Sequence, residues 1–350
     1  MVAAVTDAGR GADVGKVAVM GSGSWGTAFG QMCVDAGSDT TVWARRAEVA
    51  REIQRESTNH AYLPDVELPP DLAATDDPAA ALDGADVVVL AVPSMGIEEQ
   101  LQAWGEHIPA DATLVSLIKG VDVDSLRFGS ELISQTLDCD PDRVVVVSGP
   151  NLAKECAQRQ PAATVAACPD LARAEQVQHA VMAPYLRVYT NPDKVAVEVA
   201  GAVKNVIALA TGMAYGMGYG DNTRATVITR GLAEMTRLGV AIGGDALTFS
   251  GLAGVGDLVA TCTSNKSRNQ TVGARLGAGE SLDEIIASMN MVAEGVKSSR
   301  AIVGLAERHG VDMPISGGVV LVCHHNADPA DLVGALMSRS AKPEIYGIDT

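Results

Sequence analysis

The chain has 350 residues, of which 47% are hydrophobic and 3% aromatic, and its formal net charge is −17. This length is sufficient for two domains with full cores, and the apolar content excludes a disordered chain. The negative charge argues against non-specific binding to nucleic acid or to an anionic membrane, but it does not exclude a small anionic molecule, which responds to local charge.

The six cysteines are scattered and form no C-x-x-C pair, which predicts reduced thiols in a cytoplasmic protein. The adjacent His324 and His325 have no ligand-like residues near them in sequence, so we expect no metal site. Residues 1–14 are rich in Gly, Ala and Asp, lack the apolar core of a signal peptide, and predict a flexible tail. The longest uncharged stretch, residues 205–220, falls short of the ~20 apolar residues that a membrane span requires, so we expect no stable membrane insertion.

A glycine-rich turn follows the first predicted strand, residues 17–20. Gly21, Gly23 and Gly26 form a G-x-G-x-x-G pattern, and residues 27–36 then predict a helix. In this context the first glycine permits a tight turn, the second lets a pyrophosphate approach, and the third allows close helix–strand packing at a helix N-terminus that faces the phosphates. The pattern predicts a dinucleotide site; the alternative is an ordinary glycine-rich turn in another α/β fold.

The second predicted strand, residues 39–43, ends just before Arg45 and Arg46. A typical NAD site has Asp or Glu there to bind the ribose hydroxyls. Guanidinium groups instead pair well with a phosphate on the ribose 2′ position. The two arginines therefore favour NADP, with NAD also accepted; the alternative is two solvated arginines at the start of the next helix.

Further apolar runs predict strands that alternate with helical segments. This alternation is typical of a Rossmann-type sheet, mainly parallel, with helices on both faces. Lys119 and the turn at residues 148–151 follow two of these strands, at the edge where ligands bind. The predicted strands are residues 86–92, 113–118, 143–147 and 163–167, and the helical segments are residues 96–104 and 125–137.

Helical patterns dominate after residue 191. We therefore expect a dinucleotide-binding Rossmann domain of residues 15–190 and an all-α substrate and catalytic domain of residues 191–350. The predicted helices of the second domain are residues 194–213, 223–238, 281–289 and 298–309, and Ser281 with Glu284 has the spacing of a capping box.

The helix predicted at residues 194–213 is apolar nearly all round and carries Lys204 in its middle. The residues three and four positions away from Lys204 cannot form an ion pair with it along the helix. Desolvation would lower the pKa of this lysine and suit it to proton transfer. The alternative is a lysine whose ammonium group reaches solvent at the helix surface.

Residues 251–269 contain a second group of candidate residues. Asp257 follows three closely spaced glycines and is a candidate carboxylate partner for Lys204; the alternative is a turn or cap residue. Ser267, Arg268 and Asn269 open a predicted helix, where a helix N-terminus, a guanidinium and an amide would bind phosphate. The alternative for Arg268 is a surface charge.

Taken together and in this order, these motifs strongly resemble the bacterial NAD(P)-dependent glycerol-3-phosphate dehydrogenase family, over about residues 16–340. The resemblance implies reversible, NAD(P)H-dependent reduction of dihydroxyacetone phosphate to sn-glycerol 3-phosphate, which feeds glycerophospholipid synthesis, by a cytoplasmic homodimer. The matching motifs are GSGSWGTA at 21–28, Lys119-Gly120, Ser148-Gly149-Pro150, AGAVKN at 200–205, GVGDL at 254–258 and Ser267-Arg268-Asn269.

The resemblance also implies a role for each matching residue. Lys204 would be the general acid and base, Lys119 and Asp257 would complete its charged surroundings, and Arg268 with Asn269 would hold the substrate phosphate. Asn151 stands where the family more often has Ser or Thr. The implied substrate-binding residues are Lys119, Gly149, Asn151, Lys204, Asn205, Asp257, Ser267, Arg268 and Asn269. The implied cofactor-binding residues are Gly21, Gly23, Ser24, Trp25, Gly26, Arg45, Arg46, Lys119, Ala153, Arg268, Val292 and Glu294.

Two other functions remain open at this point. The chain could be another dehydrogenase with a Rossmann and a helical domain, acting on a hydroxy acid or a sugar acid. It could also be a non-catalytic NADP(H)-binding sensor, which would need the glycine motif but neither Lys204 nor Asp257.

Overall fold

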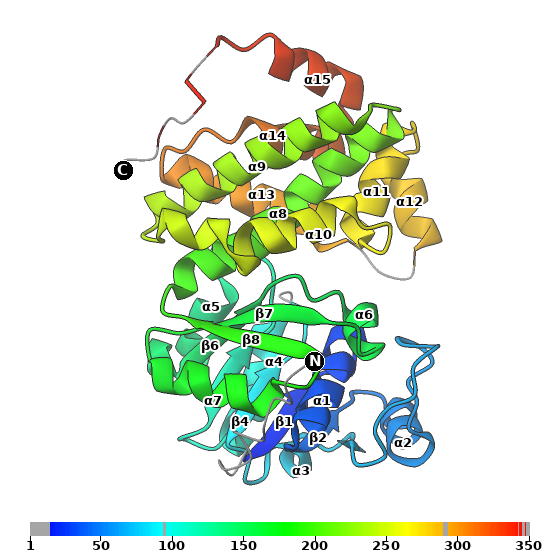
Figure 1. Cartoon of the computed structure of the whole chain (residues 1–350), viewed down its shortest axis with the longest axis vertical. Coiled ribbons are helices and arrows are strands. Elements are labelled where there is room, and N and C mark those ends of the chain that lie inside the picture. Colours follow the sequence, from blue (N-terminus) through cyan, green and yellow to red (C-terminus); the bar gives the residue numbers. More distant parts are fainter. Residues whose placement is uncertain (1–14, 94–95, 290–292, 342, 345–346, 348–350) are drawn as a thin grey trace, which may run out of the picture.

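The computed structural model describes residues 15–93, 96–289, 293–341, 343–344 and 347, so the predicted tail at residues 1–14 lies outside the described residues. Its first part is one eight-stranded sheet with the strand order β3-β2-β1-β4-β5-β6-β7-β8 (Figure 1). The strands are β1 (Lys16–Met20), β2 (Asp39–Trp43), β3 (Ala73–Thr75), β4 (Val87–Leu90), β5 (Thr113–Ser116), β6 (Val144–Ser148), β7 (Ala162–Ala167) and β8 (Leu186–Asn191).

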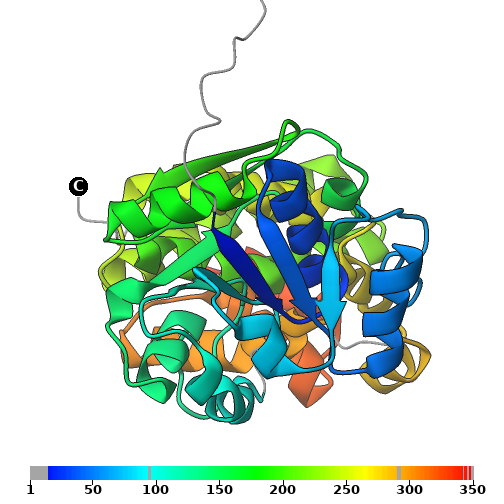
Figure 2. The ribbon, with the colours of Figure 1, turned by 90° about the horizontal axis from the view of Figure 1, so that it is seen from below.

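The predicted Rossmann-type sheet is confirmed, with helices on both faces (Figure 2). Within β1, Val17 and Val19 pack into the core on one face, while Ala18 and Met20 pack into the core on the other. All neighbouring strands are parallel except β6 and β7, which are antiparallel. The first face is covered by α1 (Ser24–Ala36), α2 (Ala47–Glu56), α6 (Ala153–Ala157) and α7 (Leu171–Val181), and the second by α3 (Pro78–Leu82), α4 (Ile97–Trp104) and α5 (Gly129–Thr136).

The strand order reverses at β1, which pairs with β2 on one side and with β4 on the other. In open parallel sheets, the crevice beyond the carboxyl ends of the strands at such a point is where ligands bind. The glycine-rich turn lies here because it joins the end of β1 to the start of α1. The topology therefore brings this turn to the same edge as the residues that follow β5 and β6.

The second part is helical and is built around α8 (Lys194–Gly216), as Figure 1 shows. Every residue from Ala196 to Ala214 in this helix is buried, as the sequence predicted, and the helix continues three residues beyond the predicted end. The other helices are α9 (Asp221–Ala241), α10 (Asp257–Thr263), α11 (Arg268–Gly277), α12 (Leu282–Ser288), α13 (Glu294–Arg308), α14 (Pro314–His325) and α15 (Pro329–Met337). Short 3₁₀ turns span Gly105–His107, Pro141–Arg143 and Ala246–Ser250, and a π-helical turn spans Leu252–Gly256.

Glycines let α11 lie directly against α8. A Cβ added at Gly273 would lie 2.1 Å from the carbonyl oxygen of Leu209, and one at Gly277 would lie 2.1 Å from that of Met213. From the other side, a Cβ at Gly212 would lie 2.2 Å from the carbonyl oxygen of Gln270. Side chains at these positions would push the helices apart, so the glycines fix how close α11 lies to α8.

The structure corrects one predicted helix, contains a strand that was not predicted, and confirms a predicted capping box. The helix expected at residues 125–137 begins only at Gly129, because residues 121–128 form a turn closed by a bond from Asp122 N to Arg127 O and a bridge between Val121 and Phe128. Strand β8 was not predicted; its burial alternates between buried and exposed residues, so it lacks the continuous apolar run of the inner strands. The capping box at Ser281 and Glu284 is confirmed.

Two buried carboxylates cap helices from elsewhere in the chain. Glu198 on α8 accepts hydrogen bonds from the backbone N–H (2.9 Å) and hydroxyl of Ser130, in the first turn of α5. Glu234 on α9 accepts from the backbone N–H groups of Ile315 (2.6 Å) and Ser316 (3.1 Å) at the start of α14. Burial raises the pKa of each carboxyl to about 7, although these hydrogen bonds oppose the rise. Glu198 thereby ties the central helix to α5, which covers one face of the sheet.

By length and composition alone, α8 is long and apolar enough to cross a membrane. The sequence expectation considered only the shorter uncharged stretch at residues 205–220, which falls short of a span. However, 94% of the most apolar window of α8 is buried inside the protein. The central helix of a globular protein passes the same test, so its hydrophobicity is explained by its position in the core.

We predict that Gly273→Ala destabilises the protein by about 1–3 kcal/mol, because its methyl group must displace the backbone of α8. Gly334→Ala is the matched control. It also lies in a helix, no described atom lies within 4 Å of its added Cβ, and it should be neutral or slightly stabilising. Urea midpoints of the two variants test this expectation. Equal midpoints would show that the helices can separate without cost.

Candidate active site

Lys204 lies in the middle of α8 and is buried, so the alternative of a lysine that reaches solvent is wrong. Its Nζ lies 2.5 Å from Oδ1 of Asp257 and 3.0 Å from the hydroxyl of Thr261. Both partners belong to α10, where they lie one helical turn apart on the same face. The carboxylate partner predicted for Lys204 is therefore Asp257.

Lys119 reaches the same carboxylate from the sheet. It follows β5, and its Nζ lies 3.0 Å from Oδ2 of Asp257, 2.9 Å from Oδ1 of Asn151 and 3.4 Å from the carbonyl oxygen of Gly149. Asp257 thus accepts one lysine on each oxygen. With both lysines protonated, this buried group carries a net positive charge next to the edge of the sheet.

The surroundings lower both the pKa of Lys204 and the pKa of Asp257, for different reasons. Burial is the main cause that lowers the pKa of Lys204 to about 8; Asp257 opposes this fall, and the nearby charge of Lys119 adds to it. Burial acting alone would raise the pKa of Asp257, but Lys119 and Lys204 outweigh it and hold that pKa below its usual value. Lys204 can therefore exchange a proton near neutral pH beside a carboxylate that remains ionised.

The backbone before Asp257 explains how its side chain is positioned. The π-helical turn Leu252–Gly256 leads directly into α10, and Asp257 is the first residue of that helix. A Cβ added at Gly254 would lie 2.0 Å from the carbonyl oxygen of Phe249, so this position requires glycine. Gly254 thus lets the backbone pack tightly just before Asp257. π-Helical turns are rare and occur frequently at functional sites.

A chain of amides connects this group to the start of α11 and α13. Asn205 donates to the carbonyl oxygen of Lys119 (3.1 Å), Asn269 donates to Oδ1 of Asn205 (2.9 Å), and Gly295 N donates to Oδ1 of Asn269 (3.0 Å). Ser267 is the N-cap of α11 and accepts from Gln270 N. Arg268, the next residue, is exposed and begins the helix beside the buried group.

Glu294 is the first residue of α13 and follows Ala293, the N-cap. Its crowded surroundings raise the pKa of its carboxyl, although the side chain keeps access to solvent, and the charges of Arg268, Lys204 and Lys119 oppose the rise. Glu294 therefore lies within electrostatic range of these cations. Val292, which was predicted to contact a cofactor, lies outside the described residues.

The glycine-rich turn has the geometry that a dinucleotide requires. Gly21 has a φ of 134°, and a Cβ there would lie 2.5 Å from the carbonyl oxygen of Ala91. A Cβ at Gly26 would lie 2.0 Å from the carbonyl oxygen of Gly21, so this glycine lets α1 pack on the turn. Around Gly23, in contrast, no described atom lies within 4 Å of the added Cβ. This is the space through which a phosphate would approach the N-terminus of α1.

The other predicted cofactor residues lie around this turn. Ser24 and Trp25 begin α1, and within the described chain the buried Nε1 of Trp25 has no hydrogen-bond partner. Ala153 begins α6 and packs against the same core as Trp25. Arg45 and Arg46 are exposed before α2, and the guanidinium carbon of Arg46 lies 5.7 Å from the ring centre of Tyr62.

Sequence reasoning missed several residues of the site. Thr261, which bonds to Lys204, is one of them. Ser148 lies 3.5 Å from Asp257; the sequence placed its turn at the ligand edge but gave Ser148 itself no role. Thr164 accepts a bond from Asn151 (3.1 Å) and so fixes the side chain that holds Lys119. The spacing of Asp257 and Thr261, four residues on a helix, is a signal that could have found Thr261. A contact between neighbouring strands carries no comparable signal in a single sequence.

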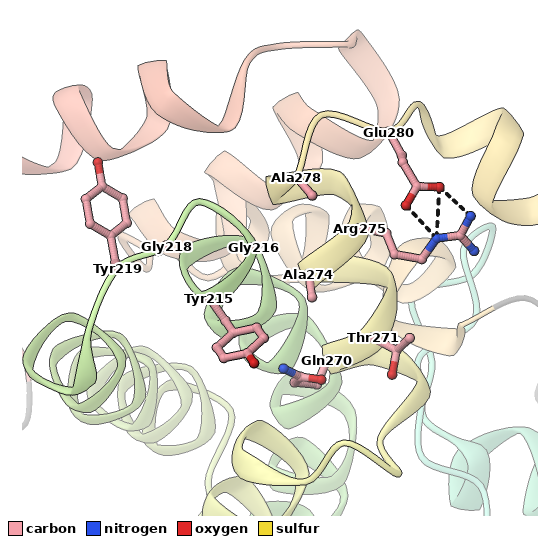
Figure 3. Close-up of a pocket in the computed structure, with 10 residues that line it drawn as sticks. All are labelled: Tyr215, Gly216, Gly218, Tyr219, Gln270, Thr271, Ala274, Arg275, Ala278 and Glu280. Carbon is pink, nitrogen blue, oxygen red and sulfur yellow. Dashed lines mark hydrogen bonds and ion pairs between the residues drawn. The ribbon is translucent and has the colours of Figure 1, made fainter.

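An open pocket of about 580 Å³ lies elsewhere, at the carboxyl end of α8 (Figure 3). Tyr215 and Gln270 border it, and the ion pair of Arg275 with Glu280 lies at one side. Tyr215 is eleven residues from Lys204, which corresponds to roughly 16 Å along the helix. The pocket contains none of the predicted site residues. Among the described residues, moreover, no three His, Cys, Asp or Glu side chains are placed to hold a metal ion.

The fold and the site together define a dehydrogenase of the Rossmann class with a helical second part, and comparison with known proteins identifies the family. Residues 16–174 match the model of the NAD-dependent glycerol-3-phosphate dehydrogenase N-terminus, and residues 193–334 match that of the C-terminus. The chain therefore belongs to the NAD-dependent glycerol-3-phosphate dehydrogenase family, a family of oxidoreductases, and the resemblance seen in its sequence is confirmed.

Individual relatives agree with this assignment. The chain is 56% identical to a glycerol-3-phosphate dehydrogenase [NAD(P)+] of Corynebacterium diphtheriae, over 94% of this chain and 100% of the relative. It is 52% identical to the enzyme of that name from Thermobifida fusca, over 95% and 99% of the two chains. The crystal structure of a glycerol-3-phosphate dehydrogenase from Coxiella burnetii superposes with a TM-score of 0.87 at 34% identity, covering 93% and 99% of the chains.

We predict that Asp257→Asn destabilises the protein by about 3–5 kcal/mol at pH 7, because two buried lysines lose the carboxylate that compensates them. Glu155→Gln is the matched control. It breaks the pair of Glu155 with Lys266, which has a similar N–O distance of 2.9 Å but is well exposed, and should change stability by no more than about 0.5 kcal/mol. Urea unfolding measures both. Similar values for the two variants would mean that the buried group is not held by charge.

Proposed function

We propose that the protein catalyses the reversible reduction of dihydroxyacetone phosphate to sn-glycerol 3-phosphate with NADPH, accepting NADH as well. The observation that carries this proposal is the buried group in which Lys204 and Lys119 share Asp257, next to the start of α11 with Arg268. A proton-transferring lysine and a phosphate-binding helix start are the two features that a phosphorylated three-carbon ketone requires.

The role of Lys204 follows from its surroundings. A bound nicotinamide would supply the hydride to the ketone carbon, and accept it in the reverse direction. As the carbonyl oxygen gains negative charge, protonated Lys204 stabilises that charge and donates a proton from Nζ to the oxygen. In the reverse direction neutral Lys204 takes the hydroxyl proton, which its lowered pKa of about 8 makes accessible.

Asp257 and Lys119 have supporting roles in this mechanism. Asp257 and Thr261 hold Nζ of Lys204, which leaves its third ammonium proton for the substrate. Lys119 neutralises the second oxygen of Asp257 and keeps the whole group positive, so it favours the developing alkoxide. Asn151 and Gly149 orient Lys119 from the end of β6.

The substrate phosphate would bind at the start of α11. Arg268 provides a charge-assisted contact there, and the helix dipole adds partial positive charge. Asn269 and Asn205 link this position to the backbone of Lys119, and Ser267 caps the helix beside them. A phosphate held at this distance from the ketone carbon would supply positioning energy for the reaction.

The cofactor would lie along the turn formed by Gly21, Gly23 and Gly26, with its pyrophosphate at the start of α1. Ser24, Trp25 and Ala153 would border it, and Arg45 and Arg46 would bind the 2′-phosphate of NADP. Lys119, Arg268 and Glu294 would meet the nicotinamide end.

We further propose that residues 15–190 form the dinucleotide-binding domain and residues 191–350 the substrate and catalytic domain. The end of the sheet at Asn191 and the start of α8 at Lys194 support this division. The family also implies a cytoplasmic homodimer whose product feeds glycerophospholipid synthesis. A light-scattering mass of twice 36.1 kDa tests the homodimer.

The pH dependence of the reaction should report the lowered pKa of Lys204. We predict that kcat/KM for reduction falls as the pH rises through about 8, because reduction needs the protonated lysine, and that kcat/KM for oxidation rises through the same pH. Steady-state rates between pH 6 and 10 measure both limbs.

Lys204→Met completes this experiment. It should remove turnover in both directions while NADPH binding, followed by fluorescence, stays within about twofold of the original. A wild-type protein that binds NADPH but turns over no ketone phosphate would instead support the sensor. If Lys204→Met kept full activity, another group would have to be the acid and base.

We predict that Arg268→Ala raises the KM for dihydroxyacetone phosphate by about 10- to 100-fold, because a charge-assisted contact to the phosphate is lost. Lys266→Ala, which removes a neighbouring exposed charge, is the control and should change KM less than about twofold. Dihydroxyacetone without phosphate should react equally slowly with both variants. An unchanged KM in Arg268→Ala would favour a hydroxy-acid or sugar-acid dehydrogenase.

A further inference from the structure

The segment at residues 57–68 joins α2 to the strand β3 and has no role in the sequence analysis. It leaves the end of α2 and returns beside the start of α1 (Figure 1). Leu63, Val66 and Leu68 anchor it in the core on that face of the sheet. Lys154 on α6 pairs with Asp65 at 2.9 Å, so the segment is held on two sides. The segment is therefore anchored beside the glycine-rich turn.

The side chain of Asn59 stabilises the glycine-rich turn by hydrogen bonds. The side chain is completely buried, and its Nδ2 donates to the carbonyl oxygen of Ser22 (3.0 Å) and to the hydroxyl of Thr27 (2.9 Å). The Thr27 hydroxyl also donates to Ser22 (3.1 Å). These bonds fix the peptide between Gly21 and Gly23, where a pyrophosphate would lie with either NADP or NAD.

Tyr62, three residues later, contacts two predicted cofactor residues. Its carbonyl oxygen accepts a hydrogen bond from the hydroxyl of Ser24 (3.0 Å), and its ring lies 5.7 Å from the guanidinium carbon of Arg46. Its own N–H donates to the carbonyl oxygen of Asn59 (3.1 Å), which fixes the backbone of this turn. One short turn thus supports both the pyrophosphate position and the arginine.

The ring of Tyr62 matters because Arg46 is otherwise weakly constrained. The Arg46 side chain is about half exposed, and its Nε lies 3.7 Å from Oε1 of Glu48, an exposed carboxylate that competes for the guanidinium. A flexible arginine loses side-chain entropy when it binds a phosphate. An aromatic face that holds the guanidinium by a cation–π interaction reduces that loss and leaves its edge free for a phosphate.

We propose that Tyr62 is a positioning residue that sets the preference for NADP over NAD, by holding Arg46 where the 2′-phosphate binds. Asn59, in contrast, supports the part of the site that both cofactors share. This inference rests on the proposed function and extends it, because it assigns the discrimination between two cofactors to a residue outside the glycine motif and the arginine pair.

The test uses two fragments that differ only by the phosphate in question. Binding of 2′,5′-ADP and of 5′-AMP is measured by calorimetry, without turnover. Tyr62→Leu should weaken 2′,5′-ADP by about two- to fivefold and leave 5′-AMP unchanged. Tyr62→Phe keeps the ring and should match the original protein. Tyr189→Leu, at an exposed tyrosine on β8, controls for the loss of a surface aromatic.

Asn59→Ser separates the two roles within the segment. It should weaken both fragments by the same factor, so their ratio should not change, and circular dichroism checks that it folds. The proposal is overturned if Tyr62→Leu leaves the ratio unchanged, or if Tyr62→Phe lowers it as much as Tyr62→Leu does. Equal binding of both fragments by the original protein overturns it as well.

These outcomes are distinct from failure of the proposed reaction. Reduction of dihydroxyacetone phosphate by the original protein is measured separately with NADPH and NADH at 340 nm (the nicotinamide absorbance). Absence of turnover with both cofactors contradicts the proposed reaction and leaves the fragment ratios meaningful. Turnover with NADH alone keeps the reaction and contradicts the preference that Tyr62 is proposed to set.

Discussion

The contact on which the rest of the site depends is the sharing of Asp257 between two lysines. Lys204 comes from the central helix, Lys119 from the end of β5, and Asp257 from α10, so one carboxylate joins the sheet to two helices. Buried charges are costly unless they are paired and hydrogen-bonded. The three residues satisfy this condition only together, and this requirement fixes the position of α8 on the sheet.

The face of α8 that meets the sheet shows how this position is maintained. Glu198, Gly201 and Asn205 lie at spacings of three and four, and therefore on one side of the helix. Glu198 caps α5, a Cβ at Gly201 would lie 3.1 Å from the hydroxyl of Ser148, and Asn205 bonds to the backbone of Lys119. Glu198, Gly201 and Asn205 thus position the helix through three separate contacts. In the sequence of the helix, Lys204 lies between Gly201 and Asn205.

Much of this could be predicted from the sequence, because the signals are local. The helix around Lys204 follows from its apolar periodicity, and the glycine-rich turn follows from its place between a strand and a helix. The pairing of Lys204 with Asp257 was harder, since 53 residues separate them and the contact depends on a π-helical turn. In a single sequence, the need for a counter-ion and the family resemblance were what indicated it.

The parts that could not be predicted are those where a residue acts through non-local packing. Asn59 and Tyr62 lie in a segment without periodicity, and their partners Ser22, Ser24 and Arg46 are brought to them by the fold. In the sequence, Glu198 is a charged residue within an otherwise apolar helix. Its role is to cap α5, and the sequence does not show that the start of α5 lies beside it. Such contacts are set by the packing of the whole sheet, so the spacing of residues along the chain does not reveal them.

The chain has a net charge of −17, and yet its proposed cofactor and substrate are both anions. The structure explains how an acidic protein can bind them. At physiological ionic strength, exposed charges farther away than about 8 Å are largely screened, whereas buried charges are screened much less. Asp257 compensates only one of the two lysines that contact it, and Arg268 lies close by at the start of a helix. This buried group therefore carries a net positive charge although the molecule is acidic, and local charge governs where a small anion binds.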